Sequence, residues 1–231
     1  MRRYLWIVLS AAVILTIGIL AGMTLYRNAK DTGAADPPTI QTEARREASR
    51  TWVEEQTASV VRLEVYDRDG TKIATGSGFA AMEGPVLVTA RHVVVNMEYM
   101  IATRDDGTTF RVDRILAADE DSDVALCALP GDAGLKPLPV KRDVPARGTK
   151  VIAIGSQFGL INLVSEGIVS GTWESDKVKR VVFTAPVSGG SSGGPLLDDA
   201  GNVIGIITGT YEKGQNLNLA AYADVIYVLN H

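Results

Sequence analysis

The sequence has few of the side chains that most often form cross-links or bind metals. Its 231 residues include one cysteine and two histidines. A single cysteine cannot form an intramolecular disulfide, so the sequence excludes a disulfide-held secreted scaffold and a cysteine-rich zinc site. A packed core must therefore stabilise the fold, and a composition with 46% apolar and 22% charged residues can supply one. We expect no metal and no cofactor.

Acidic residues outnumber basic residues outside the N-terminus. The net charge is −4, and the first 30 residues carry four basic and no acidic side chains. The rest of the chain therefore has a net charge of −8. An acidic body is a poor electrostatic match to a phosphate backbone, so we expect no nucleic-acid partner.

The N-terminus contains one long apolar segment. Tyr4 to Tyr26 is a run of 23 uncharged residues, which as a helix is about 34 Å long and can cross a hydrocarbon core of about 30 Å. The alternatives are a cleaved signal peptide and a buried helix, but the run is longer than a usual signal-peptide core. We predict a transmembrane anchor over residues 1–27. Arg2 and Arg3 favour a cytoplasmic N-terminus, with the body outside the cytoplasm, periplasmic or extracellular.

A polar linker and a folded body follow the apolar segment. Residues 28–47 contain Gly33, Pro37 and Pro38 and are typical of a linker. The composition of residues 43–56 favours a short helix. From about residue 58 the sequence becomes a series of short apolar runs separated by Gly, Asp or Pro: 59–66, 72–82, 86–90, 98–104, 108–118, 123–130, 150–155, 166–173, 179–185, 202–209 and 218–223.

This spacing of short strands is typical of an antiparallel sandwich or barrel. Residues 131–148 contain three of the nine prolines and divide the strand series in two. We predict an all-β body over residues 48–231 with two antiparallel barrels, the first over about 58–130 and the second over about 145–222. The sequence gives no indication of a homo-oligomer.

His92 is the one candidate for a general base away from the chain ends, because His231 is the last residue. It follows the apolar run 86–90. A single histidine is more often structural than catalytic, so the prediction depends on a suitable nucleophile and acid elsewhere in the chain.

The candidate nucleophile is Ser192, in the Gly-Ser segment 189–194. Such a segment is either a flexible loop or a loop whose glycines let backbone N–H groups converge on one point. In the second interpretation the N–H groups of Gly190 and Ser192 form an oxyanion hole. The segment also fits the G-x-S-x-G pattern of α/β-hydrolases, but Pro195 follows it instead of a helix, which excludes that fold.

The candidate acid is Asp123. It lies at the end of an acidic cluster, 119–123, directly before an apolar run, whereas the other acids are typical of a solvated turn. A carboxylate at this position can accept the Nδ1 hydrogen of His92 and leave Nε2 to take the proton of Ser192.

Four segments in order resemble trypsin-like serine proteases, particularly the HtrA (DegP-like) group: GSGFAAMEGPVLVTARHVV, DEDSDVALCAL, VIAIGSQFGLINLVSEGIVSG and GSSGGPLLDDAGNVIGI. The resemblance covers about residues 58–229. It implies two six-stranded β-barrels, with a triad of His92, Asp123 and Ser192 in the cleft between them. It also places six uncharged residues around the specificity pocket: Pro186, Val187, Ser188, Thr208, Gly209 and Thr210.

The sequence departs from this group in two places. The group usually has Asn before the catalytic serine, and here the residue is Ser191, which alters how the oxyanion loop is held. HtrA proteins usually append PDZ domains, and none is expected here. The short final helix that the resemblance implies falls on ADVIYVLN.

The sequence therefore predicts a membrane-anchored serine endopeptidase that acts on protein or peptide substrates through an acyl-enzyme. A pocket without a carboxylate favours small or medium apolar residues on the acyl side of the cleaved bond. The alternatives are a latent protease fold that serves as a binding or scaffolding module, and an esterase that uses the same triad. Cys127 is expected to be a core residue.

Overall fold

The computed structural model describes residues 52–81, 86–175, 178–211 and 214–231, which belong to one compact unit. No helix within these ranges is both long and apolar enough to span a bilayer. The predicted anchor, 1–27, and linker, 28–47, lie outside the described residues. The predicted helix over 43–56 is described from residue 52, and the chain is helical over 52–57.

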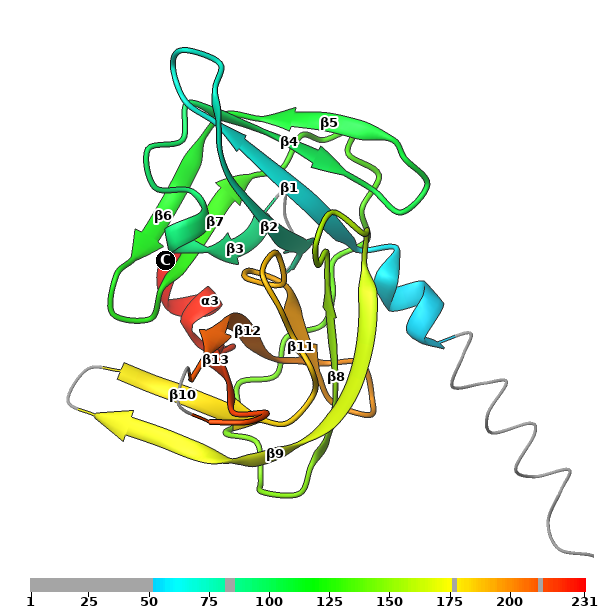
Figure 1. Cartoon of the computed structure of the whole chain (residues 1–231), viewed down its shortest axis with the longest axis vertical. Helices are drawn as coiled ribbons and strands as arrows, with labels where there is room; N and C mark the ends of the chain where they lie inside the picture. The colour runs from blue at the N-terminus through cyan, green and yellow to red at the C-terminus, as the bar shows by residue number, and fades with distance from the viewer. Residues whose placement is uncertain (1–51, 82–85, 176–177, 212–213) are drawn as a thin grey trace, which may run out of the picture. The chain divides into compact units, whose positions relative to one another are not determined.

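The first half of the body is an antiparallel sheet of seven strands in the order β5-β4-β1-β2-β3-β7-β6 (Figure 1). Strand β3 is buried along its whole length, because it pairs with β2 and β7 and packs on both faces. The strands are β1 Val60–Tyr66, β2 Lys72–Ala80, β3 Val86–Ala90, β4 Tyr99–Thr103, β5 Thr109–Val112, β6 Ile115–Asp119 and β7 Val124–Ala128.

This sheet corrects the prediction of a closed, six-stranded first barrel. The run 108–118, predicted as one strand, forms two short strands, β5 and β6, separated by Asp113 and Arg114. The chain bends there, and its two halves pair at opposite edges of the sheet, β5 with β4 and β6 with β7. The sheet is therefore closed by the covalent chain between its edges and not by a ring of hydrogen bonds.

The second half is a closed barrel of six strands in the order β10-β13-β12-β11-β8-β9, as predicted. The long strand β9 curves along the barrel and pairs with both β8 and β10 (Figure 1). The strands are β8 Lys150–Gly155, β9 Leu163–Ser175, β10 Val178–Phe183, β11 Pro195–Leu197, β12 Val203–Thr210 and β13 Asn218–Tyr222.

The two sheets share one core, which fixes the position of each relative to the other. Phe79 of β2 and Ile206 of β12 are fully buried in the same apolar cluster. The connecting segment 131–148 adds bridges from Leu138 to Ala81 and from Val140 to Val203. A site between the two sheets is therefore held by packing from both sides.

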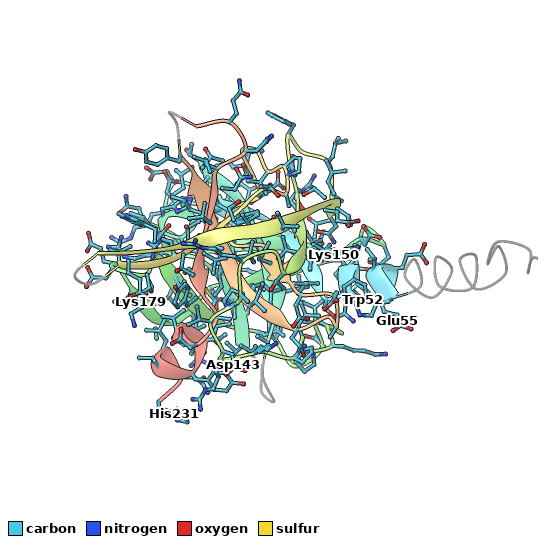
Figure 2. The ribbon with its side chains drawn as sticks, turned by 90° about the horizontal axis from the view of Figure 1, so that it is seen from below. Trp52, Glu55, Asp143, Lys150, Lys179 and His231 are labelled. Carbon is cyan, nitrogen blue, oxygen red and sulfur yellow. The ribbon has the colours of Figure 1, made fainter. Side chains whose placement is uncertain are left out.

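Helical segments lie at the start and at the end of the body in sequence. The predicted final helix is α3, Val225–Leu229, which packs against β6 and β7 of the first sheet (Figure 1). The helix 52–57 places Trp52 against Gly201, where a Cβ atom would lie 2.8 Å from the indole nitrogen. Figure 2 shows Trp52 and Lys179 at opposite sides of the body.

Candidate active site

His92 lies on a short 3-10 turn, η1 Arg91–Val93, directly after the buried strand β3. The next residue, Val93, is 2% exposed and anchors the turn, whereas the His92 side chain is 47% exposed. The backbone N–H of Arg91 donates to the carbonyl oxygen of Asp123 at 2.9 Å. The end of β3 therefore presents His92 to solvent next to the start of β7.

Asp123 binds His92 through both carboxylate oxygens. Oδ2 lies 2.7 Å from His92 Nδ1, and Oδ1 accepts the backbone N–H of His92 at 2.9 Å. Asp123 has a φ of 58°, a conformation that Asp adopts more readily than most residues and that turns its side chain back toward η1. A carboxylate that accepts the Nδ1 hydrogen keeps Nε2 unprotonated and able to act as a base.

The segment 189–194 is an ordered loop packed against both sheets. The carbonyl of Ser192 accepts the N–H of Ser77 at 2.8 Å, and the N–H of Gly193 donates to Ile207 at 2.7 Å. Gly193 has a φ of 86°, and a Cβ atom there would lie 2.2 Å from the Ser77 carbonyl oxygen. The close approach of the backbone to β2 therefore requires glycine at this position.

The peptide between Gly189 and Gly190 has a defined orientation. The carbonyl of Gly189 accepts the N–H of Phe158 at 3.2 Å. In a trans peptide the C=O and N–H groups point in opposite directions, so the N–H of Gly190 points away from Phe158. Among the described residues, the N–H groups of Gly190 and Ser192 donate to no backbone carbonyl.

Ser77 holds this loop in place, and sequence reasoning missed it. Its hydroxyl donates to the carbonyl of Gly190 at 2.7 Å and accepts the N–H of Ser156 at 2.8 Å. Ser77 is fully buried. A signal was present in the sequence, since a serine between two glycines, Gly76 and Gly78, is unusual within a strand.

Close approaches at Gly76 and Gly193 bring the Ser192 loop next to the His92 turn. A Cβ atom at Gly76 would lie 2.7 Å from Val93 and 3.0 Å from the carbonyl oxygen of Ser192. A Cβ atom at Gly193 would lie 2.7 Å from the backbone nitrogen of Ala90. The hydrogen bonds described for His92 both go to Asp123. The structure thus places the predicted nucleophile and base on adjacent segments.

A cavity of about 250 Å³ opens beside Ser192. Four of the six residues that the resemblance assigned to the pocket line it, while Pro186 and Thr208 are absent from the lining. Thr208 is turned to β13, where its hydroxyl donates to the Leu219 carbonyl at 3.3 Å. No lining residue is charged: the set is Val187, Ser188, Gly189, Ser191, Ser192, Ile207, Gly209 and Thr210. The hydroxyl of Ser191 accepts the N–H of Ser188 at 3.3 Å.

Arg180 is a second residue that sequence reasoning missed. It lies on β10, is 8% exposed, and donates to the carbonyl of Asp121 at 3.0 Å across the interface between the sheets. Burial lowers the pKa of the Arg180 guanidinium, and the carboxylates of Asp123 and Asp119 partly oppose this shift. A buried cation therefore faces the acidic segment that carries Asp123. No pattern in the sequence separates this arginine from an exposed strand residue.

Two expectations about metals and cysteine can be compared with the structure. The residues that the structure describes contain no cluster of His, Cys, Asp and Glu suited to a metal ion. Cys127 is fully buried in the core of the first sheet, as predicted, and burial raises the pKa of its thiol to about 12. Such a thiol is inert in the folded protein.

The family model of the trypsin-like peptidase domain matches residues 76–206. Serine protease HTRA1B of Danio rerio is 35% identical over 169 residues, which are 68% of this chain and 35% of that protein. The chloroplastic Protease Do-like 1 of Arabidopsis thaliana is 30% identical over 222 residues, 88% of this chain and 50% of that protein. Anti-sigma-I factor RsgI9 of Acetivibrio thermocellus is 32% identical over 170 residues, 73% of this chain and 24% of that protein.

The chain spans between a quarter and a half of the length of these relatives. Among solved structures, the HtrA-type protease AlgW with a tripeptide matches with a TM-score of 0.70 and 24% identity, covering 78% of this chain and 61% of that chain. The serine endoprotease from Yersinia pestis matches with a TM-score of 0.69 and 24% identity, covering 78% and 64%. At 24% identity, these two structural matches support the fold alone. From the family model and the curated relatives together, the chain belongs to the trypsin-like peptidase family, in its HtrA- and DegP-like group.

Proposed function

We propose that this chain is a serine endopeptidase that hydrolyses peptide bonds of proteins or peptides through an acyl-enzyme. Ser192 attacks the carbonyl carbon, and His92 takes the serine proton on Nε2. Asp123 holds the imidazole and stabilises its protonated form. His92 then protonates the leaving amine and activates the water that hydrolyses the ester. The N–H groups of Gly190 and Ser192 bind the oxyanion in both halves of the reaction.

The observation that carries this proposal is the orientation of the Gly189–Gly190 peptide. Its carbonyl is bonded to Phe158, so the N–H of Gly190 points away from Phe158, which supports its proposed role as a donor to the oxyanion. Loss of one such donor costs about 2.7–4 kcal/mol of transition-state stabilisation, so its orientation distinguishes an active site from a latent one. This geometry favours the enzyme over the scaffolding alternative, which needs no such donor.

The cavity beside Ser192 supports a preference for small or medium apolar residues on the acyl side of the cleaved bond. Its lining has no charged side chain to neutralise Lys or Arg. Burying an unpaired charge there would cost several kcal/mol, whereas a small apolar side chain gains free energy from burial.

A fluorophosphonate probe tests the nucleophile. We expect the wild-type protein to be labelled and the Ser192→Ala variant to resist labelling. Ser191→Ala is the matched control, because it removes the neighbouring buried hydroxyl and leaves Ser192 in place. Labelling that survives Ser192→Ala would refute the assignment, and turnover of an unfolded casein-like protein would show that the labelled enzyme is a peptidase.

The scaffolding and esterase alternatives differ from the proposal in what they process. A scaffolding module would bind peptides without turnover, and its Ser192 would react with the probe no faster than a free serine. An esterase would cleave ester substrates and leave the matched amides intact. Comparison of ester, amide and binding assays on one peptide sequence separates the three functions.

The proposal includes a membrane anchor at residues 1–27, with the N-terminus in the cytoplasm and the catalytic body outside it. The support is the 23-residue uncharged run and its flanking basic residues. A membrane-impermeant maleimide tests the topology on Asp143→Cys, an exposed position, with the buried Cys127 giving little background. We expect labelling of intact spheroplasts or cells from outside. Labelling only after lysis would place the body in the cytoplasm and refute this part of the proposal.

A further inference from the structure

Two paired residues of the first sheet bond to loops of the second half of the body near Gly190. Arg62 of β1 is the cross-strand partner of Ser77 of β2. Such partners place their side chains on the same face of the sheet. Ser77 donates to the carbonyl of Gly190 at 2.7 Å, and Nη1 of Arg62 donates to the carbonyl of Gly159 at 3.0 Å. Both bonds cross from the first sheet to the half that carries Ser192.

The segment 157–161, between β8 and β9, depends on hydrogen bonds more than on burial of its large side chains. Phe158 and Leu160 are 82% and 59% exposed. Phe158 has a φ of 51°, which is unusual for a large side chain, and Gly159 follows with a φ of 83°. A backbone of this kind keeps its conformation where its surroundings hold it. Among the described residues, the one side-chain hydrogen bond to the backbone of this segment comes from Arg62.

The same segment sets the orientation of the Gly189–Gly190 peptide. The N–H of Phe158 donates to the Gly189 carbonyl at 3.2 Å, and the next residue, Gly159, is the one that Arg62 holds. Arg62 therefore supports the peptide that precedes Gly190, and its cross-strand partner supports the peptide that follows. One pair of residues on the first sheet thus fixes both peptide planes beside Gly190.

A row of charges orients the Arg62 guanidinium. Its Nη2 lies 3.9 Å from Oε2 of Glu64, and each of the two side chains is 24% exposed. Oε1 of Glu64 accepts Nζ of Lys72 at 3.1 Å. Glu64 lies two residues along β1 from Arg62, so both side chains are on one face of the strand. The guanidinium is therefore held between the Glu64 carboxylate and the Gly159 carbonyl.

Stability alone does not account for an arginine at this position. The Nε atom of Arg62 is buried and has no hydrogen-bond partner in the part of the chain that the structure describes. A buried donor without a partner lowers stability, and a long, partly solvated ion pair contributes little. A methionine would fill similar space without the unpaired donor. The contact that distinguishes Arg62 is its bond to Gly159.

We infer that Arg62 is a positioning residue for the oxyanion hole. It holds the segment 157–161 so that the N–H of Phe158 keeps the Gly189 carbonyl and the N–H of Gly190 stays available to the oxyanion. Arg62 does not line the cavity beside Ser192, so it acts through this segment and not on the substrate. The inference rests on the proposed function, because it assigns the N–H of Gly190 to the oxyanion.

Hydrogen exchange of the full chain tests the link without turnover. Mass spectrometry of the fragment that contains Phe158 should show its amide exchanging about 10- to 100-fold faster in Arg62→Met, because a bond from a charged donor is lost. Arg104→Met is the matched control, since it removes a guanidinium of similar exposure, 27%, that pairs with Asp106. It should leave this exchange unchanged. An unchanged Phe158 amide in Arg62→Met would overturn the inference.

Kinetics on one peptide separate positioning from a general loss of stability. We expect Arg62→Met to lower kcat about 10-fold, less than complete loss of an oxyanion donor, because Ser77 still holds the Gly190 carbonyl. KM should stay within about twofold of wild type, and Arg104→Met should keep both constants. Arg62→Gln is a second variant for the same measurements, since it keeps a polar side chain but is too short to reach Gly159.

The two assays also separate failure of this inference from failure of the proposed function. A wild type that neither cleaves peptides nor reacts with the fluorophosphonate would refute the peptidase, and the exchange rates would still decide whether Arg62 holds the segment. An active wild type whose kcat survives Arg62→Met within twofold would overturn the inference and leave the peptidase intact. A loss of kcat that Arg104→Met matches would overturn it as well.

Discussion

The hydroxyl of Ser77 is expected to maintain the oxyanion hole, and Ser77→Ala tests this role. The substitution removes one bond to the carbonyl of Gly190, at 2.7 Å, and one from the N–H of Ser156, at 2.8 Å. Ser77 is fully buried and Ser156 is 3% exposed, so water does not readily replace the bond from Ser156, whereas Gly190 is half-buried and the loss of its bond costs less. The change therefore leaves two backbone polar groups without their partner.

The magnitude follows from these two groups. A buried polar group that loses its partner costs about 1–3 kcal/mol, so we expect Ser77→Ala to lower the free energy of unfolding by about 2–5 kcal/mol. Complete loss of an oxyanion donor lowers kcat by about 10²- to 10³-fold. The bond from Phe158 to Gly189 remains in the variant. We therefore expect a smaller loss of kcat, about 10- to 100-fold.

The assays are urea denaturation, the rate of fluorophosphonate labelling, and kcat and KM on one peptide. KM should change little, because the hydroxyl does not line the cavity beside Ser192. Thr89→Val is the matched control: it deletes a buried hydroxyl that donates to the carbonyl of Ser77 at 2.7 Å, without touching Gly190. It should lower stability and keep most of kcat.

Two outcomes would contradict this account of Ser77. If Ser77→Ala keeps kcat/KM within twofold of wild type, the hydroxyl stabilises the fold without controlling the loop. If Thr89→Val loses as much kcat as Ser77→Ala, the effect follows from general loosening of β2 and β3 and not from the Gly190 carbonyl.

Four further results are expected. Asp123→Asn should lower kcat about 10⁴-fold in a peptidase assay, because Asn favours the His92 tautomer in which Nε2 carries the hydrogen and cannot take the serine proton; normal activity would exclude Asp123 from the triad. Arg180→Met should reduce the free energy of unfolding by about 1–3 kcal/mol in urea melts, because it removes a hydrogen bond from a charged donor to the Asp121 carbonyl; Arg180→Lys should recover part of this loss. Cys127 should resist iodoacetamide at pH 8 and react in urea, because its pKa is about 12 in the folded state. The hydrogen bonds of Ser122 lower the pKa of Asp119 below its usual 3.8. Its contribution to stability is therefore present above pH 4 and lost as the pH falls through the folded pKa, and Asp119→Asn should flatten that part of the stability profile.

The sequence predicted the architecture of the barrel and the partners in the site for different reasons. The barrel strands follow from alternating apolar runs, which are local. The pairing of His92 with Asp123 could be predicted because one internal histidine and one acid beside an apolar run left few alternatives. The first sheet was predicted incorrectly, because local pattern does not show that a run bends at Asp113 and Arg114 and that its halves pair at opposite edges.

The residues that hold the site were harder to predict because their partners are distant in the sequence. Ser77 lies 113 residues from Gly190, and Arg180 lies 59 residues from Asp121. Both residues connect the two sheets. Ser77, on the first sheet that also carries His92, holds the nucleophile loop, and Arg180, on the barrel that carries Ser192, holds the acidic segment with Asp123. A shift of one sheet relative to the other would strain both links, so the geometry of the site depends on the shared core as much as on the three proposed catalytic side chains.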